Sequence, residues 1–342
     1  MFYKLIYMKK LFFLISILLV GCQGPKIQNT YFDYSNKDDK LSGGVKTIEI
    51  ETPSGKFNVW TKRIGNNPTK KVLLLHGGPG MNHEYFQAVE SFFPKESIEF
   101  YYYDQLGSEF SDKPKDESLW TTERFVDEVE QVRMSLGLNE NNFIILGHSW
   151  GGILGIEYAL KYQKNLKALI ISNMVPSIPD YIDYANNVLA PQLEPEVLEK
   201  IRGFENSGDY TNPQYLELVQ NNYYPKHVLR MPLEKWPSPV LRSAGNMNYD
   251  IYLKMQGPSE FGVVGDALLK DWDRKNDLKK LEIPVLTIGG KYDTMDPKQM
   301  EWMSKEVQNG TYLYCPEGSH WSMYDDQETY FNGVVSFINN LP

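Results

Sequence analysis

A serine in a glycine-rich turn between a short apolar run and a helical pattern constrains the fold most. Residues 143–146 read FIIL, residues 147–152 read GHSWGG, and a helical pattern follows through Tyr158 and Ala159. Small residues on both sides of Ser149 let the chain turn sharply where a Cβ would clash. A Gly-x-Ser-x-Gly string alone is a weak signal, but a strand before it and a helix after it make it specific. The sequence therefore predicts that Ser149 is a nucleophile presented at the end of a buried strand.

Short apolar runs alternate with helical patterns along the chain. The runs cover residues 72–75, 100–103, 143–146, 168–171 and 285–288. Strands buried on both faces of a parallel sheet have this composition. An alternating segment over 46–62 predicts an antiparallel hairpin at the sheet edge, and a last strand is expected at 311–315. The fold class is therefore α/β, a mainly parallel twisted sheet with helices on both faces.

Residues from about 176 to 275 break the alternation, because they are mostly helical in pattern and contain no clear core strand. We predict an inserted helical cap over the strand ends, where open α/β sheets bind their ligands. Its aromatic residues either line a pocket or pack the cap: Tyr181, Tyr184, Tyr223, Tyr224, Trp236 and Tyr249. The predicted segments are a signal peptide (1–21), a tether (22–44), a core in two parts (45–175 and 276–342) and the cap (176–275).

A serine hydroxyl needs a base to take its proton, and the chain has five histidines. His76 and His148 lie within glycine-rich turns, His83 follows the first of these turns, and His227 lies in the cap. Only His320 follows the last strand, as the chain order serine, acid, histidine requires. We predict His320 as the base.

The loop after the preceding strand contains two candidate acids, Asp293 and Asp296. Asp296 directly precedes Pro297, so it suits a helix N-cap with proline at the first helical position. Asp293 lies at the centre of the loop, and the acid need only orient the imidazole and stabilise its protonated form. We predict Asp293 as the acid, with Asp296 as the alternative.

Two backbone N–H groups are needed to stabilise the oxyanion of a tetrahedral intermediate. Trp150 follows the nucleophile and supplies one of them. Residues 76–80 read HGGPG directly after the strand at 72–75, and their glycines let the backbone approach a substrate closely. Gly78 is the predicted second donor.

The N-terminus has the pattern of an export signal. Lys4, Lys9 and Lys10 precede an apolar run at 11–20 that is too short for a stable membrane span. The run ends in LVGC, which resembles the bacterial lipobox, so we expect Cys22 to be a lipid anchor; a plain signal peptide is the alternative. The protein is then an exported, membrane-anchored lipoprotein that faces the periplasm or the cell surface. The other of its two cysteines, Cys315, has no disulfide partner.

The charge balance excludes some partners. The chain has 35 Lys and Arg against 44 Asp and Glu, for a net charge of -9, so most of its surface would repel nucleic acid. No pair of histidines has metal-ligand spacing, and no cofactor or metal is expected. The oligomeric state is open at this stage.

The motifs resemble those of the proline iminopeptidase family, a peptidase branch of the α/β-hydrolase superfamily that is similar to tricorn-interacting aminopeptidase. The matching strings are HGGPG at 76–80, GHSWGG at 147–152, DQLG at 104–107, GPSEF at 257–261, KDWD at 270–273, GKYD at 290–293 and SH at 319–320. The resemblance implies the α/β-hydrolase fold. It also implies a serine aminopeptidase that forms an acyl-enzyme and releases an N-terminal residue, often proline, from short peptides or small amides.

The resemblance further implies that cap glutamates hold the α-ammonium group of the substrate, and Glu260 is the matching position. Some relatives carry a second glutamate directly after the acid, where this chain has Thr294. Either another acid replaces it or the amine is held less strongly. Glu109 stands where many relatives have glycine, so the conformation of this turn is not predicted from the resemblance.

Other functions share some of these features. An esterase or amidase acting on substrates without a free amine would use the same three side chains, because this fold hosts many chemistries. A lipid-anchored protein that captures peptides without cleaving them would explain the export signal, but not the order of serine, acid and histidine. Dehalogenases and epoxide hydrolases use an aspartate as nucleophile, which Ser149 excludes.

Overall fold

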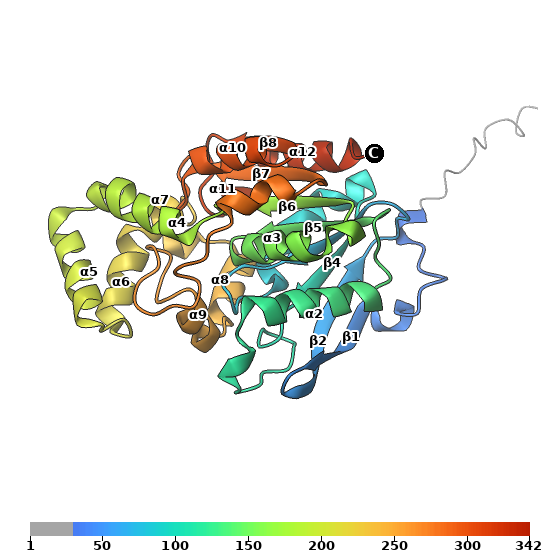
Figure 1. Cartoon of the computed structure of the whole chain (residues 1–342), viewed down its shortest axis with the longest axis horizontal. Helices are drawn as coiled ribbons and strands as arrows, with labels where there is room; N and C mark the ends of the chain where they lie inside the picture. The colour runs from blue at the N-terminus through green and yellow to red at the C-terminus, as the bar shows by residue number, and fades with distance from the viewer. Residues whose placement is uncertain (1–29) are drawn as a thin grey trace, which may run out of the picture.

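An eight-stranded sheet forms the centre of the computed structural model, which describes residues 30–342 (Figure 1). The strands are β1 Val45–Thr52, β2 Gly55–Ile64, β3 Lys71–Leu75, β4 Glu99–Asp104, β5 Phe143–His148, β6 Ala168–Ser172, β7 Pro284–Gly290 and β8 Asn309–Cys315. Their order across the sheet is β1-β2-β4-β3-β5-β6-β7-β8. β1 pairs with β2 and β2 with β4 in antiparallel fashion, and the other pairs are parallel.

The predicted apolar runs all lie within strands β3 to β7, which confirms the fold class. Successive side chains of a strand point to opposite faces of a sheet. Leu73 and Ile145 accordingly pack in one core cluster, whereas Val72 and Ile144 pack in the other. Both faces are therefore buried, as the continuous apolar character of these strands requires.

Helices cover both faces of the sheet (Figure 1). One face packs against α2 Thr122–Ser135, α3 Trp150–Tyr162 and α10 Pro297–Glu306; the other packs against α12 Gln327–Asn339 and the 3-10 segments His83–Ser91 and Phe93–Glu96. The helix α2 shows why the sequence folds this way. Thr121 caps its first turn by accepting a hydrogen bond from the Arg124 N–H, and Phe125, Val129 and Val132 form its buried stripe.

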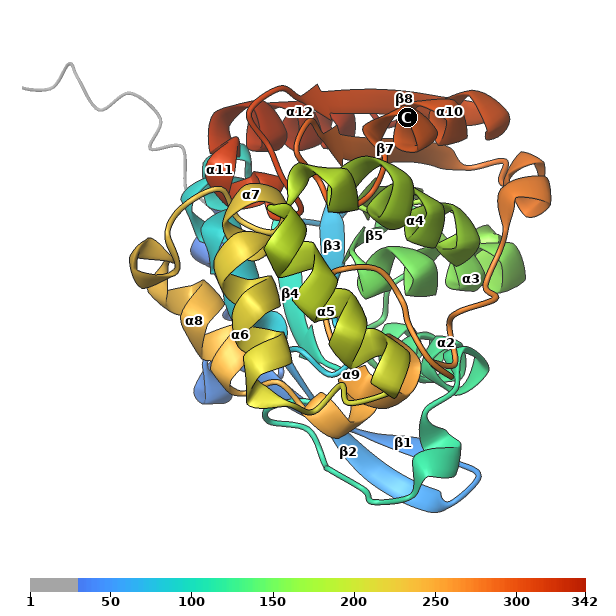
Figure 2. The same cartoon turned by 90° about the vertical axis from the view of Figure 1, so that its left-hand side faces the viewer.

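Six helices between β6 and β7 form the cap (Figure 2). They are α4 Ile178–Tyr184, α5 Pro195–Ser207, α6 Pro213–Asn222, α7 Tyr224–His227, α8 Ser238–Gly245 and α9 Tyr249–Met255. The two ends of the insertion lie side by side, because Ser177 and Asp273 form an isolated antiparallel bridge. The Ile178 N–H donates to the Trp272 carbonyl at 2.9 Å across this bridge. The chain therefore leaves and re-enters the core at one point, close to the predicted ends of the cap.

Residues 30–44 were predicted to belong to a tether outside the domain, but the structure packs them against it. Tyr31 is 2% exposed, and its hydroxyl donates to the Ile98 carbonyl at 2.7 Å. Arg63 binds the Asp39 carboxylate with its Nε at 2.9 Å. These contacts make residues 30–44 part of the packed domain. The predicted signal peptide, Cys22 and the rest of the tether lie outside the described residues.

Two further findings concern the membrane and the cysteines. Within residues 30–342, every helix is too short or too polar to cross a bilayer. Cys315 is a free thiol, fully buried at the end of β8, where it packs in the core as a small apolar side chain.

Candidate active site

Ser149 occupies a strained turn between β5 and α3, with φ 56° and ψ −126°. The turn brings α3 so close to β3 that a Cβ on Gly151 would lie 2.0 Å from the Leu75 carbonyl oxygen. A Cβ on Gly147 would lie 2.0 Å from the Gly151 carbonyl oxygen. Both positions therefore require glycine. The Ser149 N–H donates to the Ser172 carbonyl at 3.0 Å, which ties the turn to β6.

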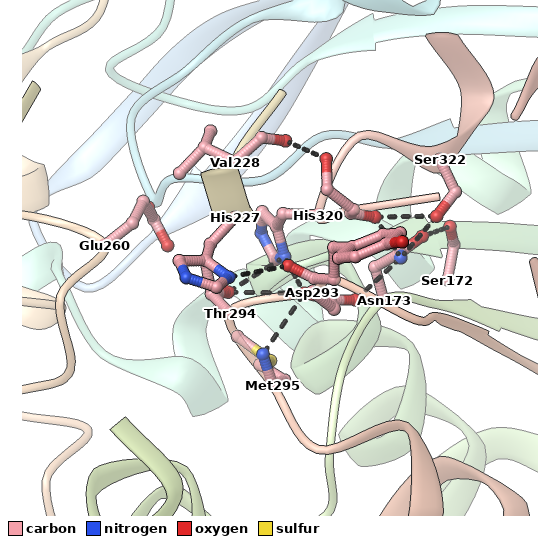
Figure 3. Close-up of polar contacts among 12 residues, drawn as sticks. Ser172, Asn173, His227, Val228, Glu260, Asp293, Thr294, Met295, His320 and Ser322 are labelled. Atoms are coloured by element: carbon pink, nitrogen blue, oxygen red, sulfur yellow. Dashed lines mark hydrogen bonds and ion pairs between the residues drawn. The ribbon is translucent and has the colours of Figure 1, made fainter. Parts of the chain in front are cut away.

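The structure distinguishes between the two candidate acids (Figure 3). Asp293 is fully buried after β7, and its Oδ1 lies 2.9 Å from Nδ1 of His320. Asp296 instead caps α10, accepting a hydrogen bond from the Lys298 N–H at 2.9 Å. Asp293 is therefore the acid that orients the imidazole of His320. Asp296, the alternative acid, is a helix cap.

His320 lies in the loop after β8 and lines the same cavity as Ser149. Because the Asp293 carboxylate can only accept, the neutral ring carries its proton on Nδ1 and has a lone pair on Nε2. That Nε2 is buried without a hydrogen-bond partner among the described residues. Burial alone would lower the pKa of His320, but the charge of Asp293 and its hydrogen bond outweigh burial and raise the pKa. The ring is thus a base that the neighbouring carboxylate has made stronger.

His148 connects the serine turn to the histidine loop. Its Nε2 lies 2.8 Å from the His320 carbonyl, and its Nδ1 lies 3.1 Å from the Tyr85 hydroxyl. The same hydroxyl accepts the Gly77 N–H at 2.7 Å. Burial, then the nearby His320, lowers the pKa of His148 well below its usual value, so this ring stays neutral. Three loops that are distant in sequence are therefore held in one arrangement.

The other histidines have different roles. His76 is fully buried and accepts the Gln105 N–H at 3.1 Å, His83 binds Asp104 at 2.8 Å, and Nδ1 of His227 lies 2.9 Å from the Tyr292 carbonyl. None of the three lines the cavity that contains Ser149.

The two predicted oxyanion donors are the N–H groups of Gly78, which lines the cavity, and of Trp150, which directly follows Ser149. A Cβ on Gly77 would lie 3.5 Å from the Ser149 hydroxyl oxygen, so the glycine-rich loop runs directly beside the serine. The N–H of Gly78 has no partner among residues 30–342, and that of Trp150 begins α3, where no intrahelical acceptor exists. Neither N–H group therefore has a hydrogen-bond acceptor within residues 30–342.

Gln105 supports this loop, although the sequence reasoning assigned it no role. Its Oε1 accepts the Trp150 indole N–H at 2.9 Å, and its Nε2 donates to the His76 carbonyl at 3.0 Å. The side chain therefore joins the serine turn to the glycine-rich loop. The sequence signal that could have indicated this role is the position of Gln105, a polar residue directly after a buried strand.

A cavity of about 400 Å³ lies between the core and the cap over Ser149. Its wall is mainly apolar and includes Met81, Leu216, Tyr224, Val228, Trp236, Met247, Tyr249 and Trp321. Of the cap aromatics whose role was open, Tyr224, Trp236 and Tyr249 line the cavity. Tyr181 and Tyr223 are fully buried and do not line it, and Tyr184 packs within the cap.

Glu260 is the only carboxylate among the residues that line this cavity. The Tyr252 hydroxyl donates to its Oε1 at 2.6 Å, and the Tyr181 hydroxyl donates to its backbone carbonyl at 2.6 Å. Burial, then the charge of Glu260, raises the pKa of Tyr252 well above its usual value, so this hydroxyl remains a donor. The carboxylate is therefore fixed in position and retains an oxygen for a cationic ligand.

Among the described residues that line the cavity, no second acid replaces the glutamate that some relatives carry at the position of Thr294. The Thr294 hydroxyl donates instead to Asp293 at 3.3 Å and lies 3.2 Å from Nδ1 of His320. Glu109, the other departure, is not among the residues with positive φ, so its turn does not require glycine.

Comparisons with known proteins agree with this fold. Residues 70–327 match the model of the α/β-hydrolase fold family. The chain is 56% identical over 294 residues to a protein named proline iminopeptidase from Flavobacterium johnsoniae, covering 86% of this chain and 98% of that one. The crystal structure of VinJ aligns with TM-score 0.79 and 25% identity, covering 87% and 99% of the two chains. The crystal structure of proline iminopeptidase from Mycobacterium smegmatis aligns with TM-score 0.74 and 28% identity, covering 86% and 98%.

We expect Asp293→Asn to lower the pKa of His320, because it removes the charge that opposes the effect of burial. Without this carboxylate the charged form of the ring loses the opposite charge that favours it, so the shift should be downward. The measurement is an NMR titration of the His320 ring, assigned with His320→Gln. Asp296→Asn, which removes a carboxylate that only caps α10, should leave the titration unchanged. Equal shifts in both variants would contradict the assignment of Asp293.

Proposed function

Because the chain belongs to the proline iminopeptidase family of the α/β-hydrolase fold, we propose that it is a serine aminopeptidase that releases an N-terminal residue, preferably proline, from short peptides. The observation that carries this proposal is the joint placement of Ser149 and one fixed carboxylate, Glu260, in the same cavity. The esterase or amidase alternative needs no such carboxylate, and the similar proteins do not favour it.

In the proposed reaction, Ser149 attacks the carbonyl carbon of the first residue while Nε2 of His320 takes the hydroxyl proton. Asp293 accepts the hydrogen bond from Nδ1 and stabilises the imidazolium. The raised pKa of His320 supports this role, because the ring must bind a proton and then give it to the leaving amine. A water molecule activated by the same ring then hydrolyses the acyl-enzyme.

The oxyanion of each tetrahedral intermediate would accept hydrogen bonds from the N–H groups of Gly78 and Trp150. Removing one such donor typically costs about 3 kcal/mol of transition-state stabilisation. These donors need no rearrangement, because Gln105 already holds the loop and the turn together. Preorganised donors are the main source of stabilisation at such sites.

Glu260 would bind the α-ammonium group and so limit cleavage to the first residue. An ammonium bound there places only the first carbonyl carbon near Ser149, whereas an N-blocked peptide has no cation to offer. The apolar wall of Tyr224, Trp236 and Trp321 suits a proline ring, which is apolar and rigid. A charge pair in this partly enclosed cavity is screened less than one on the surface.

The direct test of the activity compares p-nitroanilides of proline, alanine and N-acetylproline with p-nitrophenyl acetate. We expect turnover to fall in the order prolyl, alanyl, N-acetylprolyl amide. Ser149→Ala should abolish all turnover while leaving the thermal unfolding curve nearly unchanged, because only one oxygen is lost at a fixed turn. Preference for the blocked amide or the ester would favour the esterase alternative, and turnover retained by Ser149→Ala would exclude the mechanism.

Glu260→Gln should raise KM for prolyl amide about 10- to 100-fold, equivalent to about 1.4–2.8 kcal/mol, and leave p-nitrophenyl acetate unaffected. Glu205→Gln is the matched control, because Glu205 is also a cap carboxylate that accepts a hydrogen bond from a buried tyrosine, Tyr215, but lies outside the cavity. Equal losses with both substrates, or equal effects of the two variants, would make Glu260 a structural residue.

We also propose that the protein is exported and anchored to a membrane through a lipid on Cys22. The support is the basic and apolar N-terminal pattern that ends in LVGC. Expressed in a bacterium fed labelled palmitate, the wild-type protein should carry the label and enter the detergent phase. Cys22→Ser should lack the label and remain in the aqueous phase. An unlabelled wild-type protein in the aqueous phase would contradict the anchor.

A further inference from the structure

Asn173 is a fully buried polar residue directly after β6, and the reaction described above assigns it no part. Its backbone has φ 54°, a left-handed conformation that asparagine adopts more readily than most residues. Its N–H donates to the Ile288 carbonyl of β7 at 2.9 Å. The residue is therefore held where the ends of β6 and β7 meet, next to the loops that carry Asp293 and His320.

The side-chain amide of Asn173 joins these two loops (Figure 3). Its Nδ2 lies 2.7 Å from Oδ2 of Asp293 and 3.0 Å from the carbonyl of Ser319, the residue before His320. It also lies 3.1 Å from the Ser322 hydroxyl, which itself donates to the Ser319 carbonyl at 2.6 Å. One NH₂ group thus contacts both the acid and the loop that carries the base.

The orientation of this amide is determined by its neighbours. Oδ1 of Asn173 accepts a hydrogen bond from the Ser172 hydroxyl at 2.8 Å, and that hydroxyl accepts one from Tyr330 at 3.0 Å. Burial raises the pKa of the Tyr330 hydroxyl, so it remains a donor. On the other side, the Asp293 carboxylate can only accept. Every contact therefore agrees with Nδ2 facing Asp293.

The two oxygens of Asp293 divide their partners. Oδ1 accepts hydrogen bonds from His320 Nδ1 and, at 3.2 Å, from the Met295 N–H. Among the described residues, the donor to Oδ2 is the Asn173 amide. Without this donor, a buried carboxylate would have an unsatisfied oxygen and would turn or take up a proton. Either change weakens its hydrogen bond to His320.

We propose that Asn173 is a positioning residue for the reaction: its amide fixes both the Asp293 carboxylate and the backbone next to His320, and so sets the geometry of the acid and the base. This inference rests on the proposed function. The amide does not titrate, so it donates at every pH at which the protein is folded. It does not line the cavity, and its amide binds Asp293 and the Ser319 carbonyl, so its effect passes through Asp293 and His320.

The test measures kcat and KM of Asn173→Ala and Asn173→Asp with prolyl p-nitroanilide and with p-nitrophenyl acetate. Asn142→Ala is the matched control, because Asn142 is a buried asparagine that accepts the Asn139 N–H at 3.0 Å, at the opposite end of the sheet. We expect Asn173→Ala to lower kcat about 100-fold with both substrates, the size expected for a misplacement of about 1 Å, with KM unchanged. Asn142→Ala should keep the wild-type kcat.

Asn173→Asp provides a readout that a purely structural role would not change. Two adjacent carboxyl groups share a proton, and the pKa of the second ionisation is strongly raised. While the new carboxyl group is protonated, its O–H can donate to Asp293 as the amide does. As pH rises and this proton is lost, the two carboxylates repel each other. The ratio of its kcat to that of the wild-type protein should therefore fall with rising pH, whereas the ratio for Asn173→Ala should not fall, because no second carboxylate is present to repel Asp293.

Three results would overturn this inference alone, provided that Ser149→Ala is inactive. They are a wild-type kcat in Asn173→Ala, equal kcat losses in Asn173→Ala and Asn142→Ala, and a kcat ratio for Asn173→Asp that does not change with pH. Hydrolysis retained by Ser149→Ala would overturn the proposed function and this inference with it.

Discussion

The backbone conformation of Ser149 is the constraint on which the rest of the site depends. A left-handed φ on a residue other than glycine costs of order 1–3 kcal/mol, and it persists only where the surrounding structure enforces it. The two strands that flank β5 hold Ser149 in this conformation. On one side α3 packs against β3 through Gly151, and on the other the Ser149 N–H donates to the Ser172 carbonyl of β6. The strain is therefore balanced by the packing of three parallel strands. The loops after β3, β7 and β8 then converge on a serine whose position the sheet has already determined.

The cap does more than enclose the cavity. The N–H groups of His320 and Trp321 donate to the carbonyls of His227 and Val228 at 3.0 and 2.9 Å, so a cap segment and the histidine loop are bonded through their backbones. The Ser319 hydroxyl adds a bond to the Val228 carbonyl at 2.9 Å. The part of the cap around α7 therefore belongs to the same rigid unit as the base. The cap helices α5 and α6 extend away from the sheet (Figure 1) and carry a small core of their own.

Glu260, which lines the cavity, and Asp293, which is buried behind His320, are two carboxylates with different surroundings. Asp293 is fully buried and has hydrogen bonds to both oxygens, so it stabilises charge on His320. Glu260 is only partly buried and lines the cavity, with the Tyr252 hydroxyl on one oxygen. With Thr294 in place of a second acid, the proposed recognition of an amine would depend on this single carboxylate and on Tyr252, which donates to it.

The sequence by itself determined the features that depend on neighbouring residues. Apolar runs marked the strands, the glycines around Ser149 marked the turn, and Pro297 separated the capping Asp296 from Asp293, because each of these signals spans only a few residues. Only the tertiary structure decided which side chains from different loops meet. The packing of Tyr31, the placement of Glu260 by Tyr252, and the contact of Asn173 with Asp293 join residues 8 to 120 positions apart. No local pattern encodes such pairs. Asn173 and Asp293, for example, meet because the parallel strands β6 and β7 bring their carboxyl ends to one edge of the sheet.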